Sequence, residues 1–240
     1  MLEFRGKAAY QLYIHSKLNY LNWKDNKMNI SIFGTGNMAR GIGYRLVAGG
    51  NSVTVFGRDA VKSQALANEL RKAVKAGATV SVAKIGDSIH DGVVVLAMWY
   101  SGNIEIAQKF SGQLAGKIVL DISNALNDTY DGLTIAPDTS AGEQVAAALP
   151  KSKVVKAFNT TFANTLVEGK VAGQPLDVFI AGNDESAKAT VANLVKAGGL
   201  VSIDAGPIHR ARQLEALGLL GITLQGPHNL GFMSAWKLIH

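Results

Sequence analysis

The chain is built around short apolar runs that are rich in β-branched residues, and most of them are separated by a helical interval. The runs are apolar on both faces and lie at 29–33, 52–56, 78–82, 92–98, 117–122, 153–158, 177–182 and 200–204. Such runs are typical of strands buried in a parallel sheet. Strands that alternate with helices predict βαβ units with right-handed crossovers. The pattern therefore predicts an α/β fold with a doubly wound, mainly parallel sheet.

The helical intervals are predicted from their spacing and composition. Residues 37–48 carry Met38, Ile42 and Leu46 on one face, and residues 59–76 are rich in Ala, Leu, Lys and Glu. No Pro/Ser-rich linker divides the chain. We therefore expect one domain, closed by a short C-terminal helix over 205–224 and a tail.

Composition narrows the classes of function. The chain has 240 residues, 48% of them hydrophobic, which is enough for one sizeable core. It has no cysteine, which excludes disulfides, a thiolate nucleophile and Cys-ligated zinc. No apolar run reaches the ~18 to 20 residues that span a bilayer. The net charge of +6 is mild, and half of it comes from residues 1–27, so it suits a small anionic ligand better than nucleic acid. We expect no membrane and no nucleic-acid partner.

Residues 1–27 stand apart from the repeating pattern, because the first strand run begins only after Met28. They lack the continuous apolar core and cleavage site of a signal peptide. We expect an N-terminal extension at 1–27 and a nucleotide-binding domain at 28–240; the alternative is an arm that covers the sheet or a partner subunit. Tyr13 and Lys17 have the spacing of the short-chain dehydrogenase pair, but they precede the glycine loop, so we treat the match as chance.

A glycine loop follows the first run and opens the first helix. Its letters, GTGNMA at 34–39, fit G-x-G-x-x-A. Gly34 permits the tight turn, Gly36 lets the backbone approach a pyrophosphate, and Ala39 lets the helix pack close to the strand. The pyrophosphate is expected at the N-terminus of the helix, against free N–H groups. The strand and helix on either side supply the context that this motif requires, so the sequence predicts a Rossmann-type dinucleotide site.

The residue that follows the second run indicates which dinucleotide binds. NAD-binding proteins place an acidic residue there to hold the ribose hydroxyls. This chain instead has Arg58, whose guanidinium can bond a 2′-phosphate, and Lys62 adds charge nearby. Asp59 is expected to cap the following helix, although it could also reach the ribose. The sequence therefore favours NADP(H) over NAD.

Six segments of the chain together resemble a known family. The segments ISIFGTGNMARG, VFGRD, KIVLDISNAL, KVVKAFNT, FIAGNDESAK and DAGPIHRARQLE occur in this order between residues 30 and 215. Together they resemble the NADPH-dependent F-420 reductases, and they are equally similar to the reductase domain of six-transmembrane metalloreductases. The resemblance implies a cytoplasmic homodimer that transfers hydride between NADP(H) and a flavin-like small-molecule acceptor, which is F-420, FMN or FAD.

The resemblance also implies a set of site residues. The cofactor would contact the loop residues Gly34, Thr35, Gly36, Asn37, Met38 and Ala39, the charged pair Arg58 and Lys62, and, near the nicotinamide, Ala97, Met98, Trp99, Ser123, Asn124 and Ala163. The acceptor would contact Phe158, Asn159, Thr160, Pro207 and His209. Asn159 would bond a ring carbonyl, or else cap the turn after its strand. Archaeal F-420 enzymes carry His at this position, and the usual Pro is replaced around Met98 and Trp99, so both departures fall in the acceptor pocket.

The predicted chemistry needs no catalytic side chain and no metal, because hydride passes between the two cofactors themselves. The five histidines, His15, His90, His209, His228 and His240, have no ligand spacing. Three alternatives stay open. One is an NADPH-dependent reductase of a small carbonyl or imine, like pyrroline-carboxylate reductases and 3-hydroxyacid dehydrogenases, although too few residues follow the last strand for their second domain. The others are a non-catalytic NADPH-sensing domain and a reductase domain that serves a separate partner.

Overall fold

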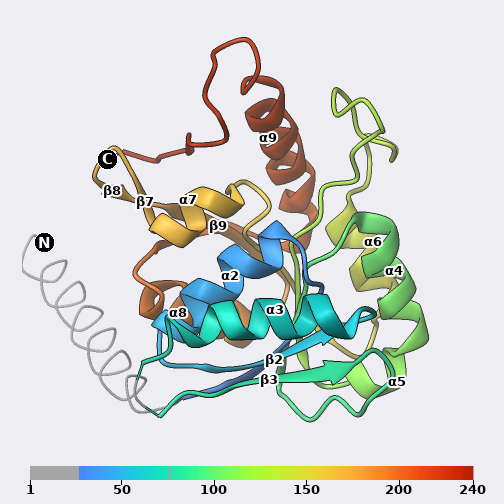
Figure 1. Cartoon of the computed structure of the whole chain (residues 1–240). Helices are drawn as coiled ribbons and strands as arrows, with labels where there is room; N and C mark the ends of the chain where they lie inside the picture. Colours follow the sequence, from blue (N-terminus) through green and yellow to red (C-terminus); the bar gives the residue numbers. More distant parts are fainter. Residues whose placement is uncertain (1–26, 76, 240) are drawn as a thin grey trace, which may run out of the picture.

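The computed structural model describes residues 27–75 and 77–239, and Figure 1 shows a central sheet covered by helices. Within these ranges the main sheet has eight strands in the order β10-β9-β6-β5-β4-β1-β2-β3. The strands are β1 Asn29–Phe33, β2 Ser52–Gly57, β3 Val80–Lys84, β4 Val93–Leu96, β5 Ile118–Asp121, β6 Lys153–Lys156, β9 Asp177–Gly182 and β10 Val201–Gly206. A short hairpin, β7 Lys170–Val171 and β8 Gln174–Pro175, lies apart from the main sheet. The predicted α/β fold with a mainly parallel sheet is confirmed.

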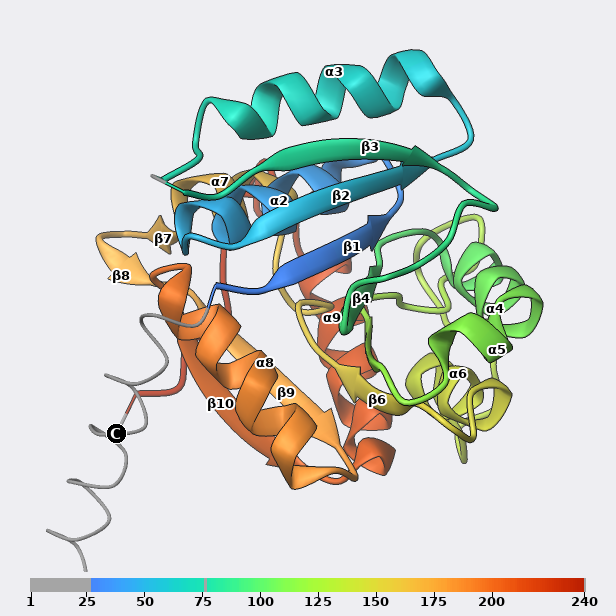
Figure 2. The ribbon, with the colours of Figure 1, turned by 90° about the horizontal axis from the view of Figure 1, so that it is seen from below.

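The helices form two layers around two apolar cores. They are α2 Asn37–Ala48, α3 Ala60–Arg71, α4 Tyr100–Lys109, α5 Ser111–Leu114, α6 Ala141–Ala148, α7 Ala163–Glu168, α8 Glu185–Ala197 and α9 Ala211–Thr223, with a 3₁₀ turn η1 at Ile208–Arg210. Apolar residues of α2, α3, α7 and α8 pack on one face of the sheet, and those of α4, α5 and α6 pack on the other. Figure 2 shows α4, α5 and α6 grouped together, away from α2 and α3.

The central strands alternate between the two cores. Ile30 and Ile32 of β1 belong to one core and Phe33 to the other, and all three are almost fully buried. The period-2 alternation of side chains along a strand explains this division. The same double burial explains why β4 is apolar at every position, with Val93 and Val95 in one core and Val94 and Leu96 in the other. β1 lies between β2 and β4, so the chain reverses its direction of winding there, which is the point where open α/β sheets bind ligands.

One strand direction differs from the simple βαβ reading. β6 and β9 pair antiparallel, with Val155 opposite Gly182 and Lys156 opposite Ala181. β9 and β10 then pair parallel to each other. The segment between β6 and β9 holds only α7 and the β7–β8 hairpin, and it brings the chain into β9 from the opposite end. The two last strands therefore run against the rest of the sheet.

The structure also corrects several predicted boundaries. The helix expected over 205–224 begins later, because β10 continues to Gly206 and η1 precedes α9. The helix expected over 59–76 ends at Arg71. Its start is fixed by Asp59, whose Oδ1 accepts from the N–H groups of Val61 and Lys62 at 2.9 and 3.1 Å. This contact confirms that Asp59 is a helix cap. No helix in the described ranges is long and apolar enough to cross a membrane.

Candidate functional site

The glycine loop has a backbone that only glycine fits at its first position. Gly34 has a φ of 129°, and a Cβ added there would lie 2.4 Å from the carbonyl oxygen of Ala97. Its N–H donates to the carbonyl of Phe56 at 2.9 Å. The turn is therefore held between the ends of β2 and β4. This close approach is the steric reason for the first glycine of the motif.

The second glycine faces open space. A Cβ added at Gly36 would meet no atom of the chain within 4 Å, and Gly36 is the N-cap of α2 with no side chain bonding its free N–H groups. Thr35, Asn37 and Met38 flank it and are partly or fully exposed, whereas Ala39 is fully buried against the core. Uncapped N–H groups beside an open glycine fit a phosphate-bearing ligand. The residues present therefore fit the pyrophosphate of a dinucleotide.

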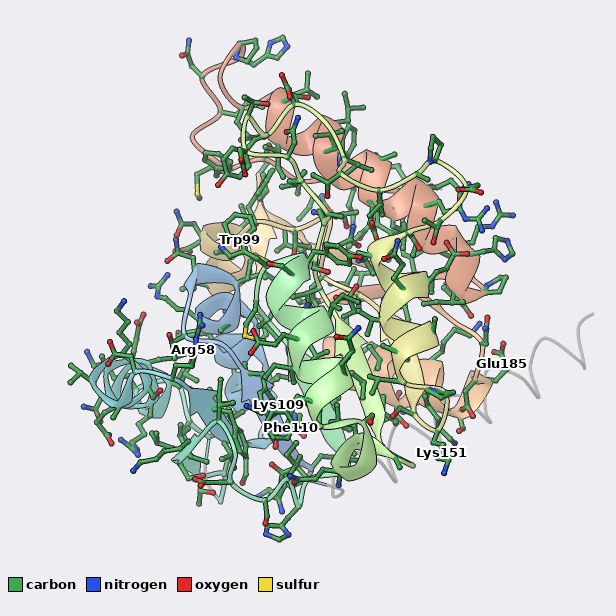
Figure 3. All side chains as sticks on the ribbon, turned by 90° about the vertical axis from the view of Figure 1, so that its right-hand side faces the viewer. Arg58, Trp99, Lys109, Phe110, Lys151 and Glu185 are labelled. Carbon is green, nitrogen blue, oxygen red and sulfur yellow. The ribbon has the colours of Figure 1, made fainter. Side chains whose placement is uncertain are left out.

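The charged pair lies at the neighbouring strand end. Gly57 closes β2 so tightly that an added Cβ would lie 2.1 Å from Ser63 Oγ and 2.8 Å from Thr35 Cγ2. The next residue, Arg58, thus lies beside the glycine loop, and its side chain is exposed (Figure 3). Lys62 is also exposed in the first turn of α3. Because the Asp59 carboxylate caps α3, the basic side chains are the groups at this strand end that remain available to a ligand.

The segment after β4 continues the same edge of the sheet. Ala97 is buried, and its N–H donates to the carbonyl of Phe33 at 2.8 Å. Met98 is partly buried, and its N–H donates to Asn103 Oδ1 at 3.2 Å. Trp99 stands at the N-cap of α4 and is 64% exposed. Figure 3 shows it at one end of α4, with Lys109 and Phe110 at the other.

The loops after β5 and β6 are joined by two asparagines. Asn124 Nδ2 donates to the Asn159 carbonyl at 3.0 Å, and Asn159 Nδ2 donates to Asn124 Oδ1 at 2.9 Å and to the Leu214 carbonyl at 2.8 Å. Both amide hydrogens of Asn159 are therefore engaged. Its Oδ1 is buried and has no partner among the described residues. The free group of Asn159 is thus a hydrogen-bond acceptor, whereas the expected bond to a ring carbonyl needs a hydrogen-bond donor.

The turn that carries Asn159 is strained at the preceding residue. Phe158 is 2% exposed and has a φ of 64°, a left-handed conformation that is costly for a bulky side chain. Its carbonyl accepts from the N–H and Oγ1 of Thr161 at 3.1 and 2.7 Å, which holds the turn closed. Thr160 is buried in the same turn. Ala163 begins α7, with its carbonyl so close to Gly41 of α2 that an added Cβ would lie 2.7 Å away.

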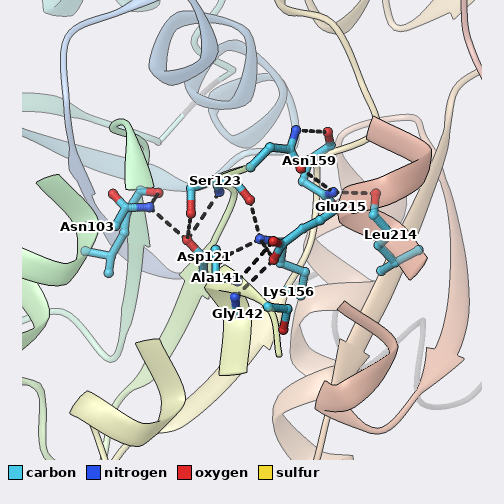
Figure 4. A network of polar contacts seen from close by, with 12 residues as sticks. Asn103, Asp121, Ser123, Ala141, Gly142, Lys156, Asn159, Leu214 and Glu215 are labelled. Atoms are coloured by element: carbon cyan, nitrogen blue, oxygen red, sulfur yellow. Dashed lines mark hydrogen bonds and ion pairs between the residues drawn. The ribbon is translucent and has the colours of Figure 1, made fainter. Parts of the chain in front are cut away.

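A buried ion cluster lies directly beneath this edge (Figure 4). Lys156 Nζ lies 2.7 Å from Asp121 Oδ2 and 2.7 Å from Glu215 Oε1, and all three side chains are fully buried. Burial opposes the charge on Lys156, but the two carboxylates outweigh it and raise the pKa of Lys156. The Glu215 carboxylate also accepts from the N–H groups of Ala141 and Gly142 at the start of α6, both at 3.0 Å.

The cluster extends to the residues that line the site. Asp121 Oδ1 accepts from Ser123 Oγ at 2.7 Å and from Asn103 Nδ2 at 2.8 Å. Asn103 Oδ1 accepts from the N–H of Met98, so β5, α4 and the loop after β4 share one polar network. Asp121, Lys156, Glu215 and Asn103 were not predicted from the sequence. A lysine at the end of an apolar run, as in KVVKAF, is the signal that could have shown that a buried partner was needed.

A pocket of about 390 Å³ opens beside Asn124. It lies between the start of α4 and the loop after β5, and it is lined by Trp99, Tyr100, Ser101, Asn124, Leu126, Asn127, Asp128, Tyr130 and Thr134. Trp99 and Asn124 were predicted from the sequence. Tyr130 was not, because nothing in the sequence marks its loop as part of a site.

Two predicted residues lie away from this group. Pro207 and His209 are exposed around η1. The contacts from α9 to the asparagine pair come later, from the Leu214 carbonyl and from Gly218, where an added Cβ would lie 2.8 Å from Asn124 Nδ2. Leu214 follows His209 by only five residues, and no hydrogen bond joins Pro207 or His209 to the asparagine pair in the described part of the chain.

Comparison with known proteins identifies the family of the chain. The family described as NADP oxidoreductase, coenzyme F-420-dependent, matches residues 29–125. An F-420-dependent NADP reductase from Methanocaldococcus jannaschii is 30% identical over 210 residues, which cover 82% of this chain and 93% of that protein. Metalloreductase STEAP3 from Rattus norvegicus is 32% identical over 190 residues, covering 79% of this chain but only 36% of that longer protein.

A solved structure supports the same assignment. The crystal structure of a candidate F-420-dependent NADP reductase from Arthrobacter sp. FB24 aligns with a TM-score of 0.76 and 32% identity, over 89% of this chain and 100% of that one. The chain therefore belongs to the F-420-dependent NADP reductase family, and it is an NADP-dependent oxidoreductase whose cofactor is NADP(H).

Proposed function

We propose that the protein transfers hydride between NADP(H) and a flavin-like ring, F-420 or a flavin, at the carboxyl edge of β1, β4, β5 and β6. The observation that carries this proposal is the pocket beside Asn124. It opens at the same sheet edge as the uncapped glycine loop. A ring bound there would lie next to the nicotinamide half of a dinucleotide that runs from Arg58 across the loop.

The cofactor is proposed to bind through the predicted residues. The backbone from Gly34 to Ala39 would hold the pyrophosphate, and Arg58 and Lys62 would hold the 2′-phosphate, because their side chains are exposed at the end of β2. Ala97, Met98, Trp99, Ser123, Asn124 and Ala163 are proposed to surround the nicotinamide half.

The bound cofactors supply the redox chemistry, and the protein supplies orientation. The Asn124–Asn159 pair fixes the two loops relative to each other, so the floor of the site is preorganised before any ligand enters. The buried ion cluster holds α9 over that floor through Glu215. We propose that Phe158, Asn159 and Thr160 form the acceptor side of this floor. Pro207 and His209 stay candidates for acceptor contact only if the acceptor extends along α9.

The test mixes the purified protein and NADPH separately with F-420, FMN, FAD and riboflavin and follows the visible absorbance of each ring. We expect at least one ring to bleach in proportion to the NADPH consumed. If no ring bleaches while NADPH still binds, the flavin-like acceptor is wrong, and a small carbonyl or imine becomes the better acceptor class.

The resemblance also predicts a homodimer in the cytoplasm, and the sequence pattern predicts an N-terminal extension at residues 1–27, which lies almost wholly outside the described residues. We propose these as properties of the protein in the cell. Light scattering of the full chain, compared with a chain that begins at Met28, would test the first and the last. A dimer mass for both forms is expected, whereas a monomer only for the shorter form would assign residues 1–27 to the interface.

A further inference from the structure

The pocket beside Asn124 is bounded on one side by a loop with an unusually well-fixed tip. Asn127 Nδ2 donates to Asp131 Oδ1 at 2.7 Å, and Asn127 Oδ1 accepts from the N–H groups of Asp131 and Gly132 at 3.1 and 3.2 Å. Thr129 Oγ1 also donates to Asp131 at 2.6 Å. The bonds from Thr129, the largest contributor, and from Asn127 lower the pKa of Asp131. The loop is therefore a formed turn.

This turn holds Tyr130 in a strained backbone conformation. Its φ is 59°, a left-handed conformation that is unfavourable for a residue with a side chain. The ring of Tyr130 meets that of Trp99, with 5.9 Å between centroids and an interplanar angle of 54°. Both rings line the pocket and both stay exposed, Tyr130 by 46% and Trp99 by 64%. Strain that points an exposed aromatic ring into a pocket is characteristic of a ligand clamp.

The charge of the residues that line the pocket limits which class of ligand can bind there. Among the described residues that line the pocket, Asp128 is the one with a formal charge, and none is a lysine or an arginine. Planar aromatic rings stack on Trp and Tyr whatever their hydrogen-bonding pattern. A negative charge on the ligand would be repelled by Asp128 without any compensating cation in the lining.

We infer that Tyr130, together with Trp99 on the nicotinamide side, forms an aromatic clamp for the acceptor ring, and that Asp128 makes the site favour an acceptor without a phosphate-bearing side chain over one that has it. The inference rests on the proposed function, because it takes the ring bound in this pocket to be the hydride acceptor. It places an uncharged flavin such as riboflavin ahead of FMN and ahead of F-420, both of which carry phosphate groups. Tyr130 and Asp128 thereby become acceptor-binding residues.

The test is an equilibrium titration of riboflavin and of FMN, followed by the fluorescence of the ring, in the absence of NADPH. This readout needs no turnover, so it separates the clamp from the proposed function. We expect riboflavin to bind more tightly than FMN, and Trp99→Leu and Tyr130→Leu each to weaken riboflavin about tenfold. Phe232→Leu is the matched control, since Phe232 is 48% exposed and contacts Phe162 outside the pocket.

The charge is tested separately with Asp128→Asn and Asp128→Lys. Each is expected to raise the affinity for FMN and leave that for riboflavin unchanged, with Lys having the larger effect. Glu105→Lys, an exposed change on α4 outside the lining, controls for a general effect of charge. Three results would each overturn the inference. They are a wild-type protein that binds no riboflavin, Trp99 and Tyr130 variants that bind it as tightly as Phe232→Leu does, and an affinity for FMN that is the same in the Asp128 variants as in the wild type. If riboflavin binds at the clamp but no ring is bleached by NADPH, the proposed function is wrong and the clamp is still supported.

Discussion

At the scale of single residues, the site depends on where a side chain is absent as much as on where one is present. Gly34 and Gly36 belong to one motif, yet their surroundings are opposite: a Cβ at Gly34 would strike the Ala97 carbonyl, and a Cβ at Gly36 would strike nothing in the chain. The first glycine therefore serves the fold and the second serves the ligand.

This contrast predicts different outcomes for the two alanine variants. Gly34→Ala should destabilise the fold by on the order of 2 kcal/mol, because it adds both a steric clash and an unfavourable φ. Gly36→Ala should leave the melting temperature unchanged and weaken NADPH binding. Thermal unfolding and NADPH titration of both variants measure this. A Gly36→Ala protein that binds NADPH normally would remove the pyrophosphate from the loop.

Arg58 is proposed to carry the preference for the 2′-phosphate. Arg58→Ala should weaken NADPH by roughly 10- to 100-fold, the range of a charge-assisted hydrogen bond, and leave NADH nearly unchanged. Lys72→Ala is the matched control, because Lys72 is an exposed cation at the far end of α3. Equal loss of affinity for both dinucleotides would show that Arg58 does not read the phosphate.

At the scale of elements, a buried charge cluster fastens α9 to the sheet. Lys156 joins β6 to β5 through Asp121 and to α9 through Glu215, and the residue before Glu215 holds Asn159. The strand run around Lys156 was predicted, and so was the glycine loop, because each has a local pattern. The partners of Lys156 were not, since they lie 35 and 59 residues away in the sequence.

Two lysines of β6 give a matched comparison. Lys156→Met leaves Asp121 and Glu215 buried without their cation, so we expect a loss of about 3 to 5 kcal/mol in the free energy of unfolding. Lys153→Met breaks only exposed contacts, with Asp184 and Ser186, so we expect a change of at most about 1 kcal/mol. Urea unfolding measures both. Similar small losses for the two variants would mean that the cluster does not hold α9.

At the scale of the whole molecule, the mainly parallel direction of the sheet was predicted from the alternation of runs, whereas the reversal of β9 and β10 was not. β9 is as apolar and as buried as the parallel strands, and strand direction leaves no mark on such a pattern. After the reversed strands, η1 leads directly into α9, whose first turn meets the asparagine pair through the Leu214 carbonyl.

The fold should lose stability in acid in a predictable range. Ser186, the Ala187 N–H and Lys153 lower the pKa of Asp184 to about 2, and Arg212, then Ser140, lower the pKa of Glu143. A lowered folded-state pKa adds stability above the unfolded value, and this stability disappears as the pH falls through the folded value. For Asp184 the window runs from its ordinary value of 3.8 down to about 2. Asp184→Asn should flatten the stability profile there. An unchanged slope would contradict the assignment.

The central claim is direct hydride transfer from NADPH to a ring at the carboxyl edge of the sheet. Single-turnover reduction of the preferred acceptor, with NADPH deuterated at either face of the nicotinamide C4, tests it most directly. The account predicts that ring bleaching slows with one deuterated face and not with the other, because one C–H bond breaks in the transfer step and the site fixes the orientation of the ring. Equal bleaching rates for both deuterated forms and for ordinary NADPH would contradict it.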